Sequence, residues 1–431
     1  MYYMKNVMQN KIVISGMGVV TAGCNNVAEF KDSLKNGKSG IKKVMYADDG
    51  KCNIKIGALL GEYFLGSDEF EKYIDIDASL YSRAKKILRN TSLSEKASVM
   101  TALEAWCDAG LYKFDIDPEL ISIIVGGSNL TKKISFDNHD SFMAEPCYLS
   151  PQYAMKFFDT NHVGILSELF QIKGEGFSVG GASASGNMAI IEAMRLLRYG
   201  LSDICVVVGA LSDLSLMELQ SFMNIGALAG KKFADRPEEA CRPFDEQHEG
   251  FVYGQGCGCL ILETEESVER RQGSFYAKLL GGGMCLDGNH LTNPNKDGEI
   301  KAMKKAIDDA KLSIEDILYL NAHGSSSSLG DNTECEAIKE LFGEHLKHMM
   351  INSTKGITGH CLSAAGVIEA IASIIQMNDR FIHDNINLEN PIDEKFTLVR
   401  GKRDNVDVKI AMSNSFGFSG INTSIIIERN F

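Results

Sequence analysis

Short runs of β-branched and other apolar residues recur along the chain, and each leads through glycine or a small polar residue toward a helical stretch. The clearest runs occupy residues 12–15, 121–125, 204–208, 317–320 and 410–412. Runs that are apolar throughout, without alternating polar positions, are typical of strands buried on both faces of a sheet. The pattern predicts an α/β protein.

Two helices have clear boundaries in the sequence. Residues 92–95 (Ser-Leu-Ser-Glu) match a capping box, in which the serine and glutamate side chains bond the free backbone N–H groups at a helix start. We expect this helix over residues 96–109, with Gly110 ending it. A second helix is expected over residues 184–199, because it is apolar on most faces as a buried helix is, and Gly200 should end it.

The start of the second helix is echoed later in the chain. Ser-Gly at 185–186 leads into Ile-Glu-Ala at 191–193, and Ala-Gly at 365–366 leads into Ile-Glu-Ala at 368–370. Two helices that open on small residues and then share a short motif indicate a duplicated unit. We place the divide between the two halves near residue 255, without a flexible linker.

Composition and charge set limits on the class of protein. With 431 residues, of which 44% are hydrophobic and 23% charged, the chain fits one large core or two fused cores. No apolar run approaches the ~18 residues of a membrane span and no signal-peptide pattern is present, so we expect a cytoplasmic protein.

Eleven cysteines without paired spacing indicate buried free thiols and no metal site. The net charge of -13 argues against a nucleic-acid partner.

The first candidate chemistry lies in residues 177–186, Phe-Ser-Val-Gly-Gly-Ala-Ser-Ala-Ser-Gly. This segment resembles the active-site turn of β-ketoacyl-ACP synthases, in which a strand ends in Ala-Cys-Ala and the cysteine opens a long buried helix. Ser183 stands where that motif has the cysteine. A thiol titrates near ~8.5, and a helix N-terminus can lower its pKa to about 3.5–7.5, which gives a thiolate that can take up an acyl group. A serine hydroxyl needs a positioned base, so we expect acyl transfer to be lost or severely reduced.

Two histidine motifs of the same family are retained. Residues 321–331, Asn-Ala-His-Gly-Ser-Ser-Ser-Ser-Leu-Gly-Asp, resemble Ala-His-Gly-Thr-x-Thr followed by Gly-Asp and contain His323. Residues 353–360, Ser-Thr-Lys-Gly-Ile-Thr-Gly-His, resemble Ser-x-Lys-x-x-x-Gly-His and contain His360. Further matching segments are 13–21, 242–245 and 414–422. Together these matches run in the family's order from about residue 10 to 430, and the chain is identified as a member of that family.

The resemblance implies a thiolase-like fold, with two pseudo-repeated halves in a five-layered αβαβα arrangement. The half 1–255 would hold Ser183 at the nucleophile position, and the half 256–431 would hold both active-site histidines. A homodimer is implied as well. The implied partner is an acyl carrier protein that brings the substrate on its phosphopantetheine arm, so no cofactor of the protein's own is expected. Basic clusters that could receive this acidic partner are Arg83 with Lys85 and Lys86, or Lys231 with Lys232.

The family's residue roles transfer to matching positions of this chain. The thioester oxygen of the substrate would lie between His323 and His360, where each hydrogen bond to the enolate left by loss of carbon dioxide is worth about 2.7–4 kcal/mol. Phe416 matches the gating phenylalanine, whose backbone N–H with that of Ser183 would form an oxyanion pocket. Residues implied to hold the arm are Ser325, Ser327, Thr292 and Asn293. Residues implied to orient the histidines and nearby water are the pairs Lys355 and Glu369, Asp331 and Glu334, and Asp287 and His290.

These residues predict decarboxylation of malonyl-ACP to acetyl-ACP, because an enolate that meets no acylated cysteine can only be protonated. Retention of both histidines beside Ser183 is similar to the malonyl-ACP decarboxylases of polyketide β-branching cassettes, which serve antibiotic biosynthesis. Two alternatives stay open. In one, a histidine activates Ser183 and the protein is a condensing enzyme that forms an acyl-serine. In the other, the chain is a non-catalytic partner of a ketosynthase, resembling chain-length factors.

Overall fold

The structure, a computed structural model, describes residues 10–44, 52–61, 70–289 and 292–430. Its centre is a ten-stranded sheet in the order β10-β9-β13-β14-β8-β1-β7-β6-β4-β5. The strands on one side of this order are β1 (Ile12–Thr21), β4 (Ile121–Gly126), β5 (Gly176–Val179), β6 (Ile204–Gly209) and β7 (Gly256–Thr264). Those on the other side are β8 (Ala277–Leu286), β9 (Tyr319–Asn321), β10 (Met350–Asn352), β13 (Ile410–Gly417) and β14 (Ile421–Arg429).

The two sets of five strands have the same topology. In each set the first strand is antiparallel to the fifth, the fifth is antiparallel to the fourth, and the fourth, second and third are parallel neighbours. The sets meet where β1 pairs with β8 over residues 12–14 and 277–279. The expected pseudo-repeat is therefore present, in a thiolase-like ketosynthase fold.

The position of β7 corrects the expected divide at residue 255. This strand pairs with β1 and β6, so it belongs to the first set of strands, whereas a divide at 255 assigns it to the second half. The boundary between the two sets falls between β7 and β8, across helix α10 (Glu265–Arg270). The sequence did not show this boundary, because a long irregular stretch precedes β7 and no local signal marks where the strand begins.

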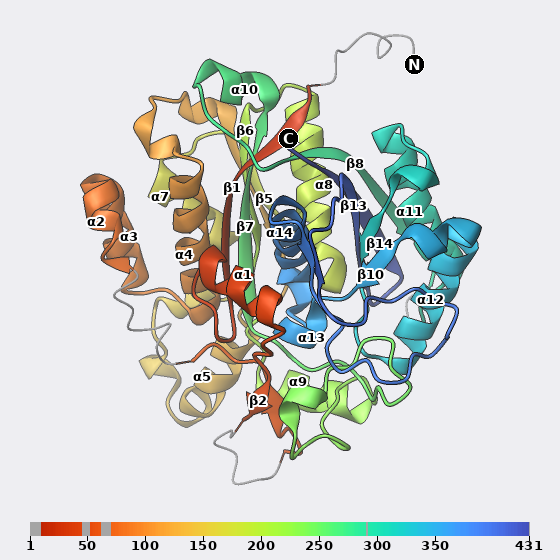
Figure 1. Cartoon of the computed structure of the whole chain (residues 1–431). Coiled ribbons are helices and arrows are strands. Elements are labelled where there is room, and N and C mark those ends of the chain that lie inside the picture. Colours follow the sequence, from red (N-terminus) through yellow and green to blue (C-terminus); the bar gives the residue numbers. More distant parts are fainter. Residues whose placement is uncertain (1–9, 45–51, 62–69, 290–291, 431) are drawn as a thin grey trace.

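Helices make three layers around the two sets of strands. In Figure 1, α4 (Leu93–Asp108) and α7 (Thr160–Phe170) cover one outer face, and α11 (Lys296–Ala310) and α12 (Ser328–Phe342) lie on the opposite side. Between them lie α8 (Ser185–Arg198) and α14 (Ala365–Asn378), which contact each other and strands of both sets. This is the five-layered αβαβα arrangement.

The remaining elements are short or peripheral. The other helices are α1 (Val27–Asn36), α2 (Tyr73–Ile76), α3 (Ala78–Leu88), α5 (Lys132–Ala144), α6 (Tyr153–Lys156), α9 (Leu216–Asn224) and α13 (Lys355–Thr358). Two small sheets pair β2 (Lys42–Lys43) with β3 (Ile56–Gly57), and β11 (Phe381–Ile382) with β12 (Arg403–Asp404). No helix within the described ranges is both long and apolar enough to cross a membrane.

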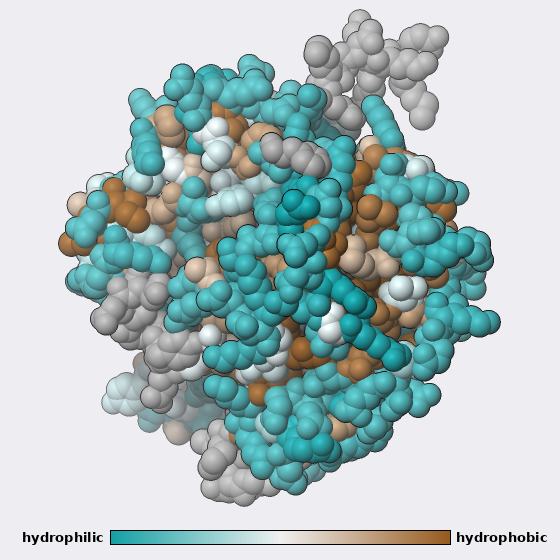
Figure 2. Space-filling model, viewed as in Figure 1, coloured by the Kyte–Doolittle hydropathy of each residue, from teal (hydrophilic) through white to brown (hydrophobic). Residues whose placement is uncertain are grey.

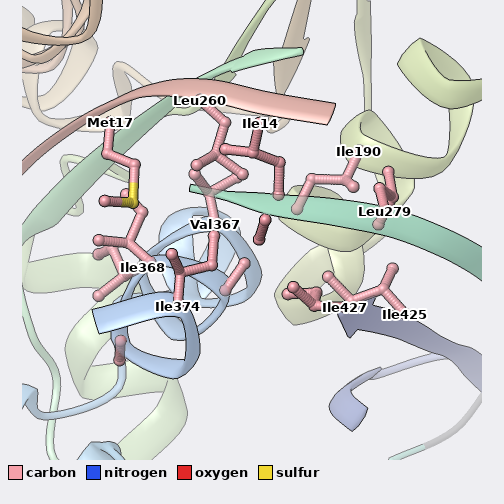
Figure 3. Close-up of a cluster of buried hydrophobic side chains, with 14 of the residues drawn as sticks. Ile14, Met17, Ile190, Leu260, Leu279, Val367, Ile368, Ile374, Ile425 and Ile427 are labelled. Carbon is pink, nitrogen blue, oxygen red and sulfur yellow. The ribbon is translucent and has the colours of Figure 1, made fainter. Parts of the chain in front are cut away.

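The largest apolar core lies around the two central helices. Figure 3 shows Ile190 of α8 and Val367 of α14 packed among side chains of both strand sets, including Leu260 of β7, Leu279 of β8 and Ile425 of β14. The face of the molecule that Figure 2 shows is mostly hydrophilic, and its hydrophobic residues form smaller groups among the hydrophilic ones. Burial of one continuous core across both strand sets explains why the chain needs no linker between its halves.

Local sequence signals explain where the predicted helices begin and end. Ser92 caps α4 with the capping box complete, and the helix begins at Leu93 rather than at the expected residue 96. Helix α8 spans nearly all of the expected 184–199. Gly110 and Gly200 follow these helices with φ of 70°, a left-handed conformation that glycine adopts without a steric penalty.

Helices α8 and α14 approach each other closely at a pair of glycines, one near the start of each helix. A Cβ at Gly366 would lie 2.7 Å from the backbone nitrogen of Asn187, and a Cβ at Gly186 would lie 2.9 Å from that of Val367. The backbone of a helix cannot move aside as a flexible side chain can. The approach therefore requires glycine at both positions, which explains the shared small-residue openings.

Replacing Gly366 by alanine should lower the free energy of unfolding by about 1–3 kcal/mol, because the added methyl group forces α8 and α14 apart. The matched control is Gly164→Ala in α7, where an added Cβ meets nothing within 4 Å; it should raise stability by roughly 0.5–1 kcal/mol. Urea denaturation of both variants measures the difference. Equal stability of the two variants would contradict the close approach.

Candidate active site

Ser183 lies in a tight turn between β5 and α8. The turn is a short 3-10 helix, η6 (Ala182–Ala184), and Ala182 has a positive φ of 49°. Ser185 fixes the turn, since its hydroxyl accepts the N–H of Gly181 at 2.8 Å and donates to the carbonyl of Ala182 at 2.7 Å. The side chain of Ser183 is half-buried, and its Oγ lies 2.9 Å from Nε2 of His360. The turn thus presents the Ser183 hydroxyl to a histidine from the other half.

His360 lies just before η10 (Leu362–Ala364), the short 3-10 turn that leads into α14 as η6 leads into α8. Its backbone is fixed to a neighbouring segment, because its N–H donates to the carbonyl of Val252 at 2.7 Å and its carbonyl accepts from Gly254 at 3.0 Å. The ring stands edge-on to Phe251 at 5.3 Å between centroids. The backbone N–H of Leu362 donates to Nδ1 of His360 at 3.1 Å. Nδ1 is therefore an acceptor.

His323 follows β9, and buried ionisable groups hold it from behind. The carboxylate of Glu334 accepts the backbone N–H groups of His323 and Gly324 at 2.8 and 2.7 Å. Lys355 donates to the carbonyl of His323 at 2.5 Å, and its Nζ lies 3.4 Å from Nδ1 of the ring. Lys355 also forms a buried ion pair with Glu369. Because an ammonium can only donate, Nδ1 of His323 is also an acceptor.

These contacts assign one tautomer to both imidazoles. A neutral imidazole has one donor and one acceptor nitrogen, so acceptance at Nδ1 leaves the hydrogen on Nε2 of both His323 and His360. Burial lowers the pKa of both rings well below 6.5, and the ammonium of Lys355 lowers it further. The ring centroids are 5.4 Å apart. The site therefore contains two neutral imidazoles with Nε2–H donors.

The tautomer of His360 also decides the direction of its contact with Ser183. Nε2–H of His360 donates, and Oγ of Ser183 accepts at 2.9 Å. His360 then has no free lone pair with which to take the proton of Ser183. The contact orders the hydroxyl without activating it as a nucleophile.

The expected acidic pair, Asp331 and Glu334, separates into different tasks. Glu334 fixes the backbone at His323, and burial raises its pKa to about 7. Asp331 instead accepts the backbone N–H of Phe244 at 2.8 Å and lies 3.5 Å from Nδ1 of His248, so it supports the neighbouring segment 242–245. Asp287 accepts from the side chain of Asn422 at 2.6 Å, and burial raises its pKa.

A pocket of about 600 Å³ gathers most of the candidate residues. Its lining includes Ser183, His323, His360, Asp287, Thr292, Asn293, Ser325, Ser327 and Phe416. Ser325 and Ser327 share a hydrogen bond of 2.8 Å, and the ring of Phe416 lies 5.8 Å from that of His323. Lys355, Glu369, Asp331 and Glu334 do not reach this lining and act from behind it. His290, the expected partner of Asp287, lies outside the described residues.

Sequence reasoning missed several residues of the pocket. Phe222 and Phe418 line it with their rings 6.2 Å apart, and Glu249 and Glu299 contribute carboxyl groups. Glu299 lies in the first turn of α11, where an acidic residue ordinarily serves the helix dipole, so its sequence position gave no distinct signal.

The two expected basic clusters occupy different places. The backbone N–H groups of Lys231 and Lys232 donate to Glu249, which lines the pocket, so this cluster lies beside the pocket. Arg83 lies on α3 and donates to the carbonyl of Leu169 in α7, on the outer helical layer. The geometry favours Lys231 and Lys232 as neighbours of the pocket.

Among the described residues, no group of three or more histidine, cysteine, aspartate or glutamate side chains is arranged to hold a metal ion. The eleven cysteines are free, and most are buried. The residues that line the pocket carry imidazole, hydroxyl and carboxyl groups and the amine of Lys132.

The fold and the two-histidine pocket define a ketosynthase-type protein, and comparison with known proteins agrees. The model of the β-ketoacyl synthase N-terminal domain matches residues 9–267, and that of the C-terminal domain matches residues 276–389. The chain belongs to the β-ketoacyl synthase family.

Two curated relatives cover nearly the whole chain. The polyketide biosynthesis malonyl-ACP decarboxylase PksF of Bacillus subtilis is 38% identical, with 97% of this chain and 96% of that protein aligned. A 3-oxoacyl-[acyl-carrier-protein] synthase 2 of Coxiella burnetii is 30% identical over 98% of this chain and 99% of that protein.

Solved structures match over the same length. A β-ketoacyl synthase from Burkholderia phymatum has a TM-score of 0.86 with 27% identity, covering 98% of this chain and 100% of that one. The type II polyketide ketosynthase complex AntDE:AntF, solved with its acyl carrier protein, has a TM-score of 0.85 with 25% identity and the same coverage.

Replacing Lys355 by methionine should destabilise the fold by about 3–5 kcal/mol, because it leaves the carboxylate of Glu369 buried without its cation. The loss should grow as pH rises above 4.5, the ordinary pKa of this group, which burial already raises to about 7. Without the ammonium the folded-state pKa rises further, so the folded variant keeps a proton that the unfolded chain releases. Urea denaturation at several pH values measures both effects.

The control is the double variant Lys355→Met/Glu369→Gln, which has no charge at either position. It should recover most of the lost stability and show little of the added pH dependence. A double variant as unstable as the single one would show that the loss comes from packing rather than from an unpaired charge.

Proposed function

We propose that this protein decarboxylates malonyl-ACP to acetyl-ACP in polyketide biosynthesis, without a condensation step. The observation that carries the proposal is the pair of neutral imidazoles, each with Nδ1 engaged and a hydrogen on Nε2, that line one pocket. Two such donors suit an oxygen that becomes negative during the reaction. They need no proton transfer of their own to stabilise it.

In the proposed reaction the malonyl thioester oxygen lies between His323 and His360 and takes over the hydrogen bond that His360 gives to Ser183 in the free protein. Breaking the bond to the carboxylate releases carbon dioxide and leaves an enolate, whose oxygen gains charge as the bond breaks. Preorganised donors in a buried pocket stabilise that charge more than they stabilise the neutral thioester, which lowers the barrier. Glu334 and Lys355 contribute by holding His323 in position.

In this proposal Ser183 fills space beside His360 and takes no part in the chemistry. Its hydroxyl accepts a hydrogen bond from His360, and neither pocket histidine is placed to deprotonate it. A carboxylate base that could reorient His360 would have to engage Nδ1, but the backbone N–H of Leu362 occupies that atom. An acyl-serine is therefore disfavoured, and with it the condensing alternative.

The relatives support the substrate assignment. PksF, at 38% identity, is named a malonyl-ACP decarboxylase of polyketide biosynthesis, and AntDE:AntF is a ketosynthase bound to its acyl carrier protein. By analogy, the phosphopantetheine arm would enter past Ser325 and Ser327, with Thr292 and Asn293 at the same wall. The substrate would bring this arm, and the protein would need no cofactor of its own.

The chain-length-factor reading predicts an inactive chain, and the preserved imidazole pair argues against it. A protein that only shapes a partner's pocket has no need for two ordered imidazoles or for the buried ion pair behind them. Burying such an ion pair costs free energy, because both charged groups lose their contact with water. Its presence therefore indicates a catalytic or structural role.

A homodimer is part of the proposal. Strand β5 ends the ten-stranded sheet and is only partly buried, so its edge is available for pairing. The segment 132–158, which connects β4 to β5, exposes large apolar side chains: Phe136, Phe142, Met143, Tyr148, Met155, Phe157 and Phe158. Exposed apolar groups of this number are typical of an interface.

The activity is tested by intact-mass spectrometry of malonyl-ACP after incubation with the purified protein and two variants. Wild type should produce acetyl-ACP. His323→Ala should be slower by about 100-fold or more, since one oxyanion donor is lost. Ser183→Ala should stay within about threefold of wild type, because the hydroxyl forms no bond to substrate. Loss of activity in Ser183→Ala equal to that in His323→Ala would contradict the role given to the serine.

The dimer is tested by sedimentation velocity. The double variant Phe142→Glu/Met143→Glu should sediment as a monomer, because two charges replace apolar contacts. Leu201→Glu, a control at a side chain 53% exposed after α8, should sediment as wild type does. A wild-type monomer at micromolar concentration would refute the dimer.

A further inference from the structure

One carboxyl group in the wall of the pocket is almost fully buried. Glu299 lines the pocket, yet its side chain is only 1% exposed. Its Oε2 is buried without a hydrogen-bond partner among the described residues. An unpartnered buried oxygen costs free energy, so its presence beside a reaction pocket calls for a role.

The surroundings of Glu299 favour a neutral carboxylic acid. The titratable groups that face it are Glu334 and Asp331 on α12 and Asp287 after β8, and no cation is among them. Burial raises the pKa of Glu299 well above 4.5, and these three carboxyls raise it further. Glu299 can therefore keep a proton while the solvent-exposed acids of the chain are ionised.

The proposed reaction needs such a proton. When carbon dioxide leaves, the α-carbon of the enolate must gain a hydrogen before acetyl-ACP can form. His323 and His360 donate hydrogen bonds as neutral imidazoles, and a neutral imidazole is a poor acid. They stabilise the enolate oxygen but do not supply the carbon with its proton.

The other described carboxyl groups that line the pocket each accept at least one hydrogen bond. Glu249 accepts the backbone N–H groups of Gly230, Lys231 and Lys232. Glu218 accepts from the backbone and hydroxyl of Ser215 at the start of α9. Asp287 is half-buried; its Oδ1 accepts from Asn422, and its Oδ2 has no partner among the described residues. Glu299 is distinguished from Asp287 by its deeper burial.

We propose that Glu299 is the general acid that protonates the α-carbon of the enolate. The proposal rests on the decarboxylase function proposed above. The O–H bond of Glu299 breaks, its hydrogen forms the new C–H bond of the acetyl group, and the electron pair stays on the carboxylate. A proton from water then restores the acid, so each turnover consumes one proton and releases one carbon dioxide.

The test compares steady-state acetyl-ACP formation by wild type, Glu299→Gln and Asp297→Asn across a range of pH. Asp297 lies in the same first turn of α11 but is exposed and does not line the pocket, so its variant makes the same acid-to-amide change outside the site. Glu299→Gln should lower kcat by about 100-fold with little change in KM, since general acids contribute about 10²–10⁴. Asp297→Asn should match wild type.

The pH profile separates an acid from a structural group. A donor acts only while protonated, so the wild-type rate should fall as pH rises through the pKa of Glu299. The rate of Glu299→Gln should be low and should not fall over this pH range, because the amide does not titrate. Thermal unfolding of each variant shows whether it is folded, and Glu299→Ala provides a second variant without the carboxyl.

Several results would overturn the proposal. One is a Glu299→Gln or Glu299→Ala rate within about threefold of the Asp297→Asn rate. Another is a loss by the same factor at every pH, with the descending limb retained, since a structural defect would act in that way. If wild type itself forms no acetyl-ACP, the decarboxylase function fails first, and the assignment of Glu299 falls with it.

Discussion

The close approach of α8 and α14 is the constraint on which the rest of the site depends. Gly186 and Gly366 let the two helices touch backbone to backbone, and each helix begins directly after a functional turn. Ser183 precedes one helix and His360 precedes the other, so the crossing sets the 2.9 Å contact between residues that are far apart in sequence. A side chain larger than hydrogen at either crossing position would separate the turns. Packing in the central layer thus determines the geometry of the chemistry.

Buried ionisable groups then decide what the pocket can do. Lys355, held by Glu369, engages Nδ1 of His323, and a backbone N–H engages Nδ1 of His360. Both rings are neutral donors as a result, which suits stabilisation of an enolate and does not suit activation of a serine. Burial also raises the pKa of Glu299. Burial of the pocket's ionisable groups therefore underlies both the proposed enolate stabilisation and the proposed proton source.

Contiguous motifs could be predicted from the sequence, and contacts across the fold could not. The cap at Ser92 and the buried strands were predicted because their signals are local. The divide at residue 255 was wrong because the place of β7 depends on pairing with β1 and β6, which no local signal specifies. The tautomer of His323, set by Lys355, and the burial of Glu299 depend on segments distant in sequence. The resemblance named the histidines, while their protonation required the structure.

The measurement that tests the central claim most directly is a single-turnover reaction of malonyl-ACP with excess wild-type protein, with intact masses recorded for both proteins. The account predicts that malonyl-ACP becomes acetyl-ACP while the mass of the protein itself never changes. An acylated form of the protein that appears and decays during the reaction, or a condensed β-ketoacyl-ACP product, would show that Ser183 acts as a nucleophile and would contradict the account.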